Sequence, residues 1–414
     1  MAEILGSLDD LKQPQSERKF LLGTLTFGHT VIHWYQQMFP VLLPLIKTDL
    51  GLSAVQVGSL MSAKQGASGL LTLPSGFAAD AFNKHKAVIL GSALAMGGVA
   101  YVVASVAPNF FWMLVFLMLL GAASALWHPS SVSTLSLQFT DRRGTALALH
   151  GVGASIGDSV GPLCIGAMLL VMGWKDLAQW HMIPAVILAF LMWRTVRQHY
   201  SAGPGGLTRR SYFAGIKGIF ARPTVFMVMI ASSFVGMARL SVTTFLPLYL
   251  AEVMNYDSFW LGFHWALLYA MGVFSQPLMG VLSDRFSRKM VLLPSFATMG
   301  ILYLLLPMPD GGVLLALIIA AMGMFFYGTG NIATAAVLDV ASDQVQGTTQ
   351  SFMTLFQQVV TLPAPIVAGF IVSQYGYTTM FYYSSVLLFS AAAVWTFIRI
   401  PKRTATADGG GGNS

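Results

Sequence analysis

Long apolar stretches alternate with short polar segments along the whole chain. A bilayer core about 30 Å thick needs roughly 20 apolar residues in a helix. A membrane-spanning strand uses only about ten residues of alternating polarity, so the length of these stretches predicts helices. Twelve spans are expected, at residues 20–46, 53–80, 87–107, 110–137, 145–171, 178–198, 224–250, 258–282, 290–307, 312–338, 347–373 and 377–398.

Lysine and arginine are distributed unevenly between the two sides of these spans. With the N-terminus inside, nineteen of the 23 basic residues fall in cytoplasmic segments, and the outer loops hold only Lys47 and Lys175. Cytoplasmic loops of membrane proteins carry such an excess. We therefore expect a multi-pass protein of the inner (plasma) membrane with both termini in the cytoplasm. The first nineteen residues contain no apolar stretch, so no cleavable signal peptide is expected.

Composition excludes several classes of protein. Hydrophobic residues make up 55% of the chain and charged residues 9%, whereas soluble domains carry roughly 25% charged residues. The net charge of +7 comes from residues at the span ends and not from one stripe, so no nucleic-acid partner is expected. The single cysteine, Cys164, excludes a disulfide framework and a cysteine-rich metal site. We find no motif of hydrolase or phosphate-loop chemistry, so we expect no enzyme, no cofactor and no metal site.

The two halves of the chain repeat each other at an offset of 203 or 204 residues. This predicts an all-α membrane protein with twelve transmembrane helices in two pseudo-symmetric halves: residues 1–196, a linker at 197–223, residues 224–400 and a flexible tail at 401–414. Duplicated halves favour transport by alternating access, and a duplicated scaffold without transport is the alternative. The matched positions are Pro44 with Pro247, Gly58 with Gly262, Gly76 with Gly280, Asp80 with Asp284, Gly144 with Gly347, Pro162 with Pro365, Gly166 with Gly369 and Gly173 with Gly376.

The loop after the eighth span reads Gly-Val-Leu-Ser-Asp-Arg-Phe-Ser-Arg-Lys from Gly280 to Lys289. It resembles the loop signature of the major facilitator superfamily, and the first-half copy keeps the glycine and the aspartate but has Ala81 in place of arginine. The resemblance implies a conformational latch, because a carboxylate there can cap a helix or pair with a base. A loop that merely carries positive charge is the alternative. The expected latch residues are Gly76, Asp80, Gly280, Asp284, Arg285 and Arg288.

Two further motifs narrow the resemblance. Glycines at every fourth position before a proline in the fifth span resemble the glycine-rich motif of drug antiporters, although close helix packing explains them equally well; they are Gly153, Gly157, Gly161 and Pro162. The first span, with His29, His33, Tyr35 and Gln36, and the Trp-His-Pro sequence at His128 are similar to transporters of the fosmidomycin-resistance type. That similarity implies efflux, and His33 stands where those transporters have Asp.

Ionisable residues in the middle of a span are costly and therefore indicate function. Lys64 and Arg239 give two fixed positive charges there, and Asp158 is the one acid. This excess favours an anionic ligand, which Arg239 can clamp with two parallel bonds. Alternatively, Lys64 and Asp158 form a structural ion pair, and the histidines only join helices. Asp158 and His33 are expected to couple a proton. The expected substrate-binding residues are Arg239, Lys64, His33, His29, Gln36, Tyr35, His128, Asn331 and Gln357.

These observations together predict a secondary transporter, a proton-coupled exporter of a small organic anion or an amphiphilic drug-like compound. A multidrug exporter of neutral or cationic compounds and an uptake system for a small metabolite are the transporter alternatives. A transporter-like membrane sensor is the alternative from another class, although no added soluble domain is visible in the sequence. The expected partners are an anionic small molecule, a proton and the lipid bilayer, and the chain is expected to act as a monomer.

Overall fold

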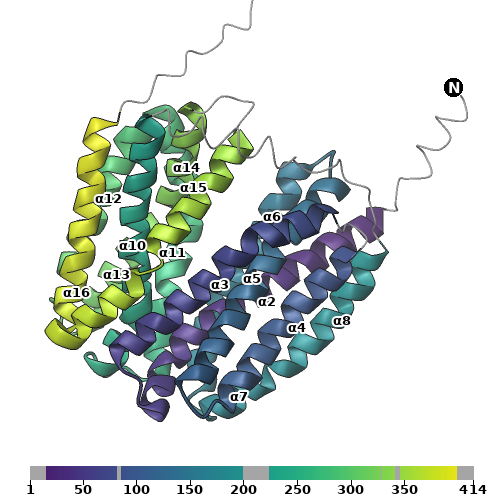
Figure 1. The fold of residues 1–414 in the computed structure, drawn as a ribbon, viewed down its shortest axis with the longest axis horizontal. Coiled ribbons are helices and arrows are strands. Elements are labelled where there is room, and N and C mark those ends of the chain that lie inside the picture. Colours follow the sequence, from purple (N-terminus) through teal and green to yellow (C-terminus); the bar gives the residue numbers. More distant parts are fainter. Residues whose placement is uncertain (1–14, 82–84, 199–222, 327, 341–345, 399–414) are drawn as a thin grey trace, which may run out of the picture.

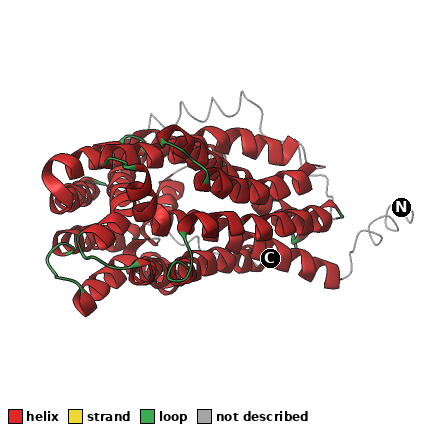
Figure 2. Ribbon diagram, turned by 90° about the horizontal axis from the view of Figure 1, so that it is seen from below, coloured by secondary structure: helices red, strands yellow, loops and turns green. Residues whose placement is uncertain are grey.

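The computed structural model describes residues 15–81, 85–198, 223–326, 328–340 and 346–398. Every regular element in this part of the chain is a helix (Figure 2), which confirms the all-α fold class. The predicted linker and tail lie almost entirely outside the described residues. The helices are α2 (Gln15–Leu50), α3 (Ala54–Ala81), α4 (Lys86–Ser105), α5 (Phe110–Gln138), α6 (Arg143–Met168), α7 (Trp174–Trp180), α8 (Met182–Arg197), α10 (Pro223–Glu252), α11 (Ser258–Arg285), α12 (Arg288–Leu305), α13 (Gly312–Phe326), α14 (Gly328–Val340), α15 (Gln346–Thr361) and α16 (Ala364–Phe397).

Some of these helices divide or join the predicted spans. The sixth span is α8 preceded by the short α7, the tenth is α13 with α14, and the eleventh is α15 with the first part of α16. Inside α16 the backbone of Gly376 has φ 81°, a value that a residue without a Cβ adopts easily. The chain turns there, and the rest of α16 is the twelfth span.

Within the described residues, eight segments are apolar and long enough to cross a membrane by length and composition alone. The helices α2, α3 and α6 are not among them. These three helices carry His29, His33, Lys64 and Asp158 in their interiors. Several of the residues predicted to have a function therefore lie in the three long helices that do not meet this criterion.

The helices form two bundles that lie close together at one end of the molecule and separate toward the other (Figure 1). In the first bundle α2 packs on α6, and α3 packs on α5. In the second, α10 packs on α16 and α11 on α13. The N-terminal end of α2 and the C-terminal end of α16 lie at the end where the bundles separate.

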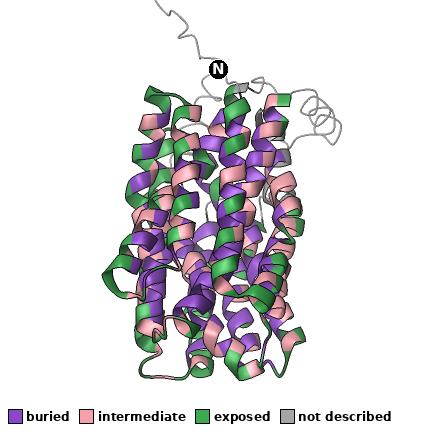
Figure 3. Ribbon diagram, turned by 90° about the vertical axis from the view of Figure 1, so that its left-hand side faces the viewer, coloured by how far each residue is buried: buried purple, intermediate pink, exposed green. Residues whose placement is uncertain are grey.

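Large apolar side chains are exposed on the outer faces of the bundles, and buried positions face inward (Figure 3). Val171, Phe274 and Val313 are each more than 70% exposed. A soluble monomer rarely exposes apolar surface on this scale, whereas lipid tails solvate it readily. The burial pattern is thus that of a protein that spans a membrane.

The bundles meet along two equivalent helix pairs, α3 with α16 and α6 with α11. A Cβ atom at Gly58 would overlap the carbonyl oxygen of Pro365, and one at Gly262 would overlap that of Pro162. Likewise, Gly369 lies against Ala54 and Gly166 lies against Ser258. These glycines and prolines are the repeated positions of the sequence, so the internal repeat marks the two close contacts between the halves.

Charged residues join the bundles at the end where they converge. Lys47 Nζ of α2 lies 2.5 Å from Glu252 Oε1 of α10, and the Tyr377 hydroxyl donates to Glu252 Oε2 at 2.7 Å. A second ion pair, between Lys175 and Asp49 at 2.7 Å, stays within the first bundle. Glu252 is therefore a bridge between the halves at this end.

Candidate functional site

A cavity of about 360 Å³ lies beside Arg239, near the middle of α10. The Arg239 guanidinium carbon lies 4.1 Å from the centre of the Phe326 ring. No ion pair involves Arg239 within the described residues. We call this space the Arg239 cavity, and its lining residues are Gln65, Gly236, Arg239, Leu240, Thr243, Tyr269, Phe326, Thr354, Gln357, Gln358 and Thr361.

The lining of the Arg239 cavity combines one positive charge with neutral polar and aromatic groups. Gln357 Nε2 donates to the Ser232 carbonyl at 3.0 Å, which fixes the amide at the cavity wall. The lining contains no aspartate or glutamate among the described residues. An arginine without a carboxylate partner keeps its five N–H donors available for an anion.

Lys64 does not line the Arg239 cavity, although the sequence predicted that both cations would face one ligand. Its neighbour Gln65 faces the cavity instead. The positive charge of Lys64 interacts with Asp158, but no ion pair joins the two within the described residues. The Asp158 carboxylate contacts His33 and Gln37.

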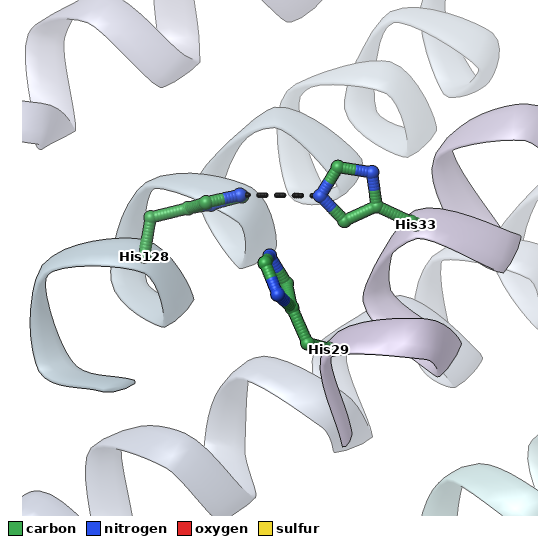
Figure 4. A group of neighbouring side chains, drawn as sticks. All are labelled: His29, His33 and His128. Carbon is green, nitrogen blue, oxygen red and sulfur yellow. Dashed lines mark hydrogen bonds between the residues drawn. The ribbon is translucent and has the colours of Figure 1, made fainter. Parts of the chain in front are cut away.

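A second polar group fills the interior of the first bundle. His29 and His33 come from α2 and His128 from α5, and their side chains point toward one another (Figure 4). His33 Nε2 and His128 Nε2 are 3.4 Å apart. We call these three residues the histidine cluster.

Asp158 connects the histidine cluster to the second bundle. Its Oδ1 atom lies 2.9 Å from His33 Nδ1 and accepts a hydrogen bond of 2.7 Å from Gln37 Nε2. Gln37 Oε1 in turn accepts a hydrogen bond of 2.9 Å from Trp265 Nε1 of α11. Asp158 is 4% exposed, and these hydrogen bonds help to compensate for the hydration that the carboxylate loses on burial.

The fourth histidine of this region, His150, lies behind the cluster. Its ring stacks on that of His29 with centroids 4.0 Å apart, and its backbone oxygen lies 2.9 Å from His29 Nδ1. Trp127 stacks on the same pair. His150 was not among the predicted site residues, although it lies eight residues before Asp158 on α6 and therefore on nearly the same face.

Tyr35 and Gln36 lie outside the Arg239 cavity and the histidine cluster. The Tyr35 hydroxyl donates to the His181 carbonyl at 2.8 Å, and the ring is buried among Tyr101 and His181. Gln36 Nε2 donates to the Leu120 carbonyl at 2.9 Å. These are helix-packing contacts. Gln37, which was not among the predicted site residues, continues the four-residue spacing of His29 and His33 and makes the contact to Asp158.

Asn331 also lies outside the cavity lining. It is exposed, and its Nδ2 atom donates to Gln276 Oε1 at 3.2 Å. Its repeat partner His128 belongs to the histidine cluster, so the two halves place the equivalent residue in different surroundings.

The glycines of the fifth span form the surface on which α2 rests. A Cβ at Gly153 would overlap the Thr26 carbonyl, and one at Gly157 would overlap that of Thr30 and the Cβ of His33. Gly161 faces the ring of Trp34. This close approach lets the short Asp158 side chain reach His33 across the two helices.

Of the predicted latch residues of the second half, Arg288 and Asp284 contact each other. The arginine guanidinium pairs with Asp284 and lies 3.1 Å from Asp339 on α14, and it donates to Ser283 Oγ at 2.6 Å. All these partners belong to the second bundle. Asp80 lies in α3, but its side chain is outside the described part of the chain. At the same end, the Arg18 hydrogen bond to Asp141 holds the pKa of that carboxyl below its usual value.

Relatives and solved structures place this arrangement among known proteins. The chain is 23% identical over 293 residues to the fosmidomycin resistance protein of Escherichia coli, covering 69% of this chain and 70% of that protein. It is 25% identical over 414 residues to a probable sulfoacetate transporter, SauU, of Cupriavidus necator, covering 94% and 95%. A solved bacterial homolog of the human lysosomal transporter Spinster, in an inward-facing and occupied conformation, superposes with a TM-score of 0.77 at 18% identity, covering 93% of this chain and 97% of that one.

The family model of the Major Facilitator Superfamily matches residues 25–365 and 273–413, which together span nearly the whole chain. Members of this family are membrane transporters and not enzymes. The polar interior of the two bundles is accordingly the interior of a transporter of small molecules: this chain belongs to the Major Facilitator Superfamily.

Proposed function

We propose that the protein is a proton-coupled exporter of a small organic anion, which binds at Arg239. The observation that carries this proposal is the Arg239 cavity, where a guanidinium with no ion-pair partner among the described residues faces about 360 Å³ of space. A charge-assisted bond to such a group contributes about 1.5–3 kcal/mol. The name of the Cupriavidus necator relative denotes an anion, sulfoacetate, and this supports the same ligand class.

The guanidinium of Arg239 lies over the phenyl ring of Phe326. The ring covers one face of Arg239 at 4.1 Å, which leaves the N–H edge directed at the ligand. Neutral amides from Gln65, Gln357 and Gln358 line the same space. They can accept or donate hydrogen bonds to the uncharged part of the ligand, so the site suits a compound with one anionic end.

Efflux, the proton as coupling ion and the cytoplasmic position of both termini belong to the same proposal. The excess of basic residues in alternate loops supports the orientation. With the N-terminus inside, the bundles separate toward the cytoplasm, as expected for an inward-open state. The resemblance to the fosmidomycin resistance protein supports efflux, and His33 with Asp158 is the hydrogen-bonded pair proposed to carry the proton.

Ligand binding tests the proposal directly, because a ligand of the folded state raises thermal stability. Purified protein would be heated with matched carboxylates, sulfonates and phosphonates, and with their amides or esters. We expect only anions to raise the melting temperature. Arg239→Ala should weaken binding about 10- to 150-fold, and Arg239→Lys, which keeps the charge but loses the planar fork, should weaken it less.

Arg197→Ala is the matched control, since Arg197 lies over Trp193 at the end of α8, away from the cavity. It should bind anions like the parent. Stabilisation by cations that survives in Arg239→Ala would instead favour the multidrug alternative. Transport into or out of proteoliposomes under an imposed pH gradient then tests the coupling ion and the direction.

A further inference from the structure

The Nδ1 atoms of the histidine cluster each face a hydrogen-bond acceptor. Asp158 Oδ1 lies 2.9 Å from Nδ1 of His33, the Ser124 carbonyl 2.8 Å from that of His128, and the His150 carbonyl 2.9 Å from that of His29. Carboxylate and carbonyl oxygens only accept hydrogen bonds, so each Nδ1 carries the proton. Each neutral ring then presents a bare lone pair on Nε2.

These lone pairs converge. The Nε2 atoms of His33 and His128 are 3.4 Å apart, a distance at which two bare lone pairs repel unless a cation lies between them. Within the described residues, Nε2 of the buried His29 has no hydrogen-bond partner. The ring of His29 lies 4.7 Å from that of His33 and 5.3 Å from that of His128. Three acceptors thus share one small volume without a donor among them.

We propose that His29, His33 and His128 form a binding site for a late first-row divalent metal ion, with Zn²⁺ as its representative. One ring nitrogen from each residue lies within 4.8 Å of the other two. A zinc–nitrogen bond of about 2.0–2.1 Å in a tetrahedral site places neighbouring ligand nitrogens about 3.3–3.4 Å apart. The His33–His128 separation of 3.4 Å already has this value, and a modest rotation of His29 completes the triangle.

The ligand type selects the class of metal. Three imidazoles without a thiolate or a carboxylate suit Zn²⁺, Ni²⁺ or Cu²⁺, whereas Mg²⁺ and Ca²⁺ prefer oxygen ligands. The His33 side chain is 21% exposed, which gives the ion an access route and leaves room for a fourth ligand such as water. The sequence, with a single cysteine and no metal-binding motif, predicts no metal site, and this proposal departs from that prediction. The three histidines come from two helices whose mutual rotation the sequence does not specify.

The groups behind the histidines are those that metal sites use to orient their ligands. A ligating histidine usually donates its other N–H to a carboxylate or a backbone carbonyl, and this bond fixes the ring and raises its basicity. Asp158 does so for His33, and it is itself held by Gln37. The nearby negative charge of Asp158 also favours a cation at the cluster.

His264, which lies on α11 outside the histidine cluster, allows a comparison of hydrogen bonding. Its Nδ1 lies 2.8 Å from the Trp260 carbonyl, and its Nε2 also has no partner within the described residues. The bond to the carbonyl one turn earlier is therefore not specific to the cluster. The convergence of three rings is specific, and His264→Gln is accordingly the matched control.

This inference goes beyond the proposed anion transport, since it concerns the first bundle and does not require Arg239. A proton shared by His33 and His128 is the competing occupant of the same space, and a metal ion and a proton exclude each other there. A measurement of metal binding to the purified protein, without any transported ligand, distinguishes a bound metal ion from a shared proton. Its outcome is independent of whether anions bind or are transported.

The test uses the full-length protein, purified without a polyhistidine tag and stripped of metal. We expect one Zn²⁺ per chain by elemental analysis after desalting, and intense visible absorption typical of tetrahedral Co²⁺ on cobalt addition. Each of three substitutions should abolish the cobalt absorption and lower the metal affinity at least about 100-fold: His29→Gln, His33→Gln and His128→Gln. His264→Gln should keep both the absorption and the affinity of the parent. Asp158→Asn should weaken binding about 10- to 100-fold and leave the cobalt spectrum tetrahedral.

Thermal unfolding of the metal-free variants shows whether each is folded. Zn²⁺ should raise the melting temperature of the parent and of His264→Gln and, at higher concentration, that of Asp158→Asn, but not that of the three cluster variants. A folded parent that binds no Zn²⁺ and gives no cobalt absorption would overturn the proposal in favour of the shared proton. Binding that survives all three cluster substitutions, or that disappears in His264→Gln, would place the metal elsewhere and overturn it as well.

Discussion

The indole Nε1 of Trp265 donates a hydrogen bond of 2.9 Å to Oε1 of Gln37, and this bond crosses from α11 in the second bundle to α2 in the first. The same Gln37 side chain donates to Asp158, which pairs with His33. Tyr269, one turn after Trp265, lines the Arg239 cavity. Hydrogen bonds from His33 to Trp265 and the ring contact of Trp265 with Tyr269, whose centroids lie 5.4 Å apart, therefore link the histidine cluster to the proposed anion site.

Trp265→Phe should weaken the connection between the two sites. The substitution removes the indole N–H and keeps most of the buried aromatic volume, so the fold should persist. The loss of one buried hydrogen bond corresponds to about 0.5–1.5 kcal/mol, or about 2- to 13-fold in an equilibrium constant. We expect anion binding to be almost unchanged and ion-coupled transport to fall. Trp395→Phe is the control, because the buried Trp395 Nε1 has no hydrogen-bond partner within the described residues.

Gln357→Ala should reduce anion affinity about 2- to 10-fold, because it removes one neutral hydrogen bond at the wall of the Arg239 cavity. Asn331→Ala is its control: both are amide residues of the second bundle, but Asn331 points to Gln276 and does not line the cavity. The thermal-shift titrations of the two variants can be compared directly. Equal losses in both would show that the cavity does not hold the ligand.

Glu252→Gln should favour the state in which the bundles separate at the Lys47 end. It removes the ion pair with Lys47 and leaves Tyr377 with a weaker acceptor. Exposed ion pairs contribute only about 0.2–1 kcal/mol, so the population of that state should rise up to about fivefold. Spin labels on α2 and α10 would report the distance change. Asp49→Asn breaks the Lys175 pair within one bundle and should leave the distribution as in the parent.

Gly58→Ala and Gly262→Ala should have matching effects, since each adds a Cβ against a proline carbonyl across the interface between the halves. The added atom cannot be accommodated without separating α3 from α16 or α6 from α11. We expect both variants to lower the thermal stability of the present conformation and to favour opening at the Lys47 end. Gly23→Ala, where an added Cβ meets nothing within 4 Å, should behave like the parent.

Asp284→Asn should slow transport while expression persists, because Asp284 and Asp339 hold Arg288 at the loop and neither lies at the anion site. Asp339→Asn should have a similar effect. A smaller effect is expected for Asp80→Asn, since Ala81 stands where the second-half loop has Arg285. Initial transport rates, normalised to protein in the membrane, test this order. Transport rates that stay at the parent value in both Asp284→Asn and Asp339→Asn would contradict a latch at this loop.

The sequence by itself determined the twelve spans, the repeat and the positions where the halves approach closely. These features depend on local composition: the length of an apolar stretch decides whether it crosses a bilayer, and glycine or proline at matched positions marks backbone contact. Gly58 with Pro365 and Gly262 with Pro162 are examples that the repeat already contained, although their pairing across the interface appeared only in three dimensions.

Only the tertiary structure decided which polar side chains meet. Adjacent residues of a helix point about 100° apart, so a helix rotated by one position in its bundle presents a different neighbour. Gln37 and not Gln36 reaches Asp158, and Gln65 and not Lys64 faces the Arg239 cavity. The rotation of each helix follows from packing along its entire length, as with α2 on the glycines of α6. The convergence of the three histidines therefore follows from packing that no single segment encodes.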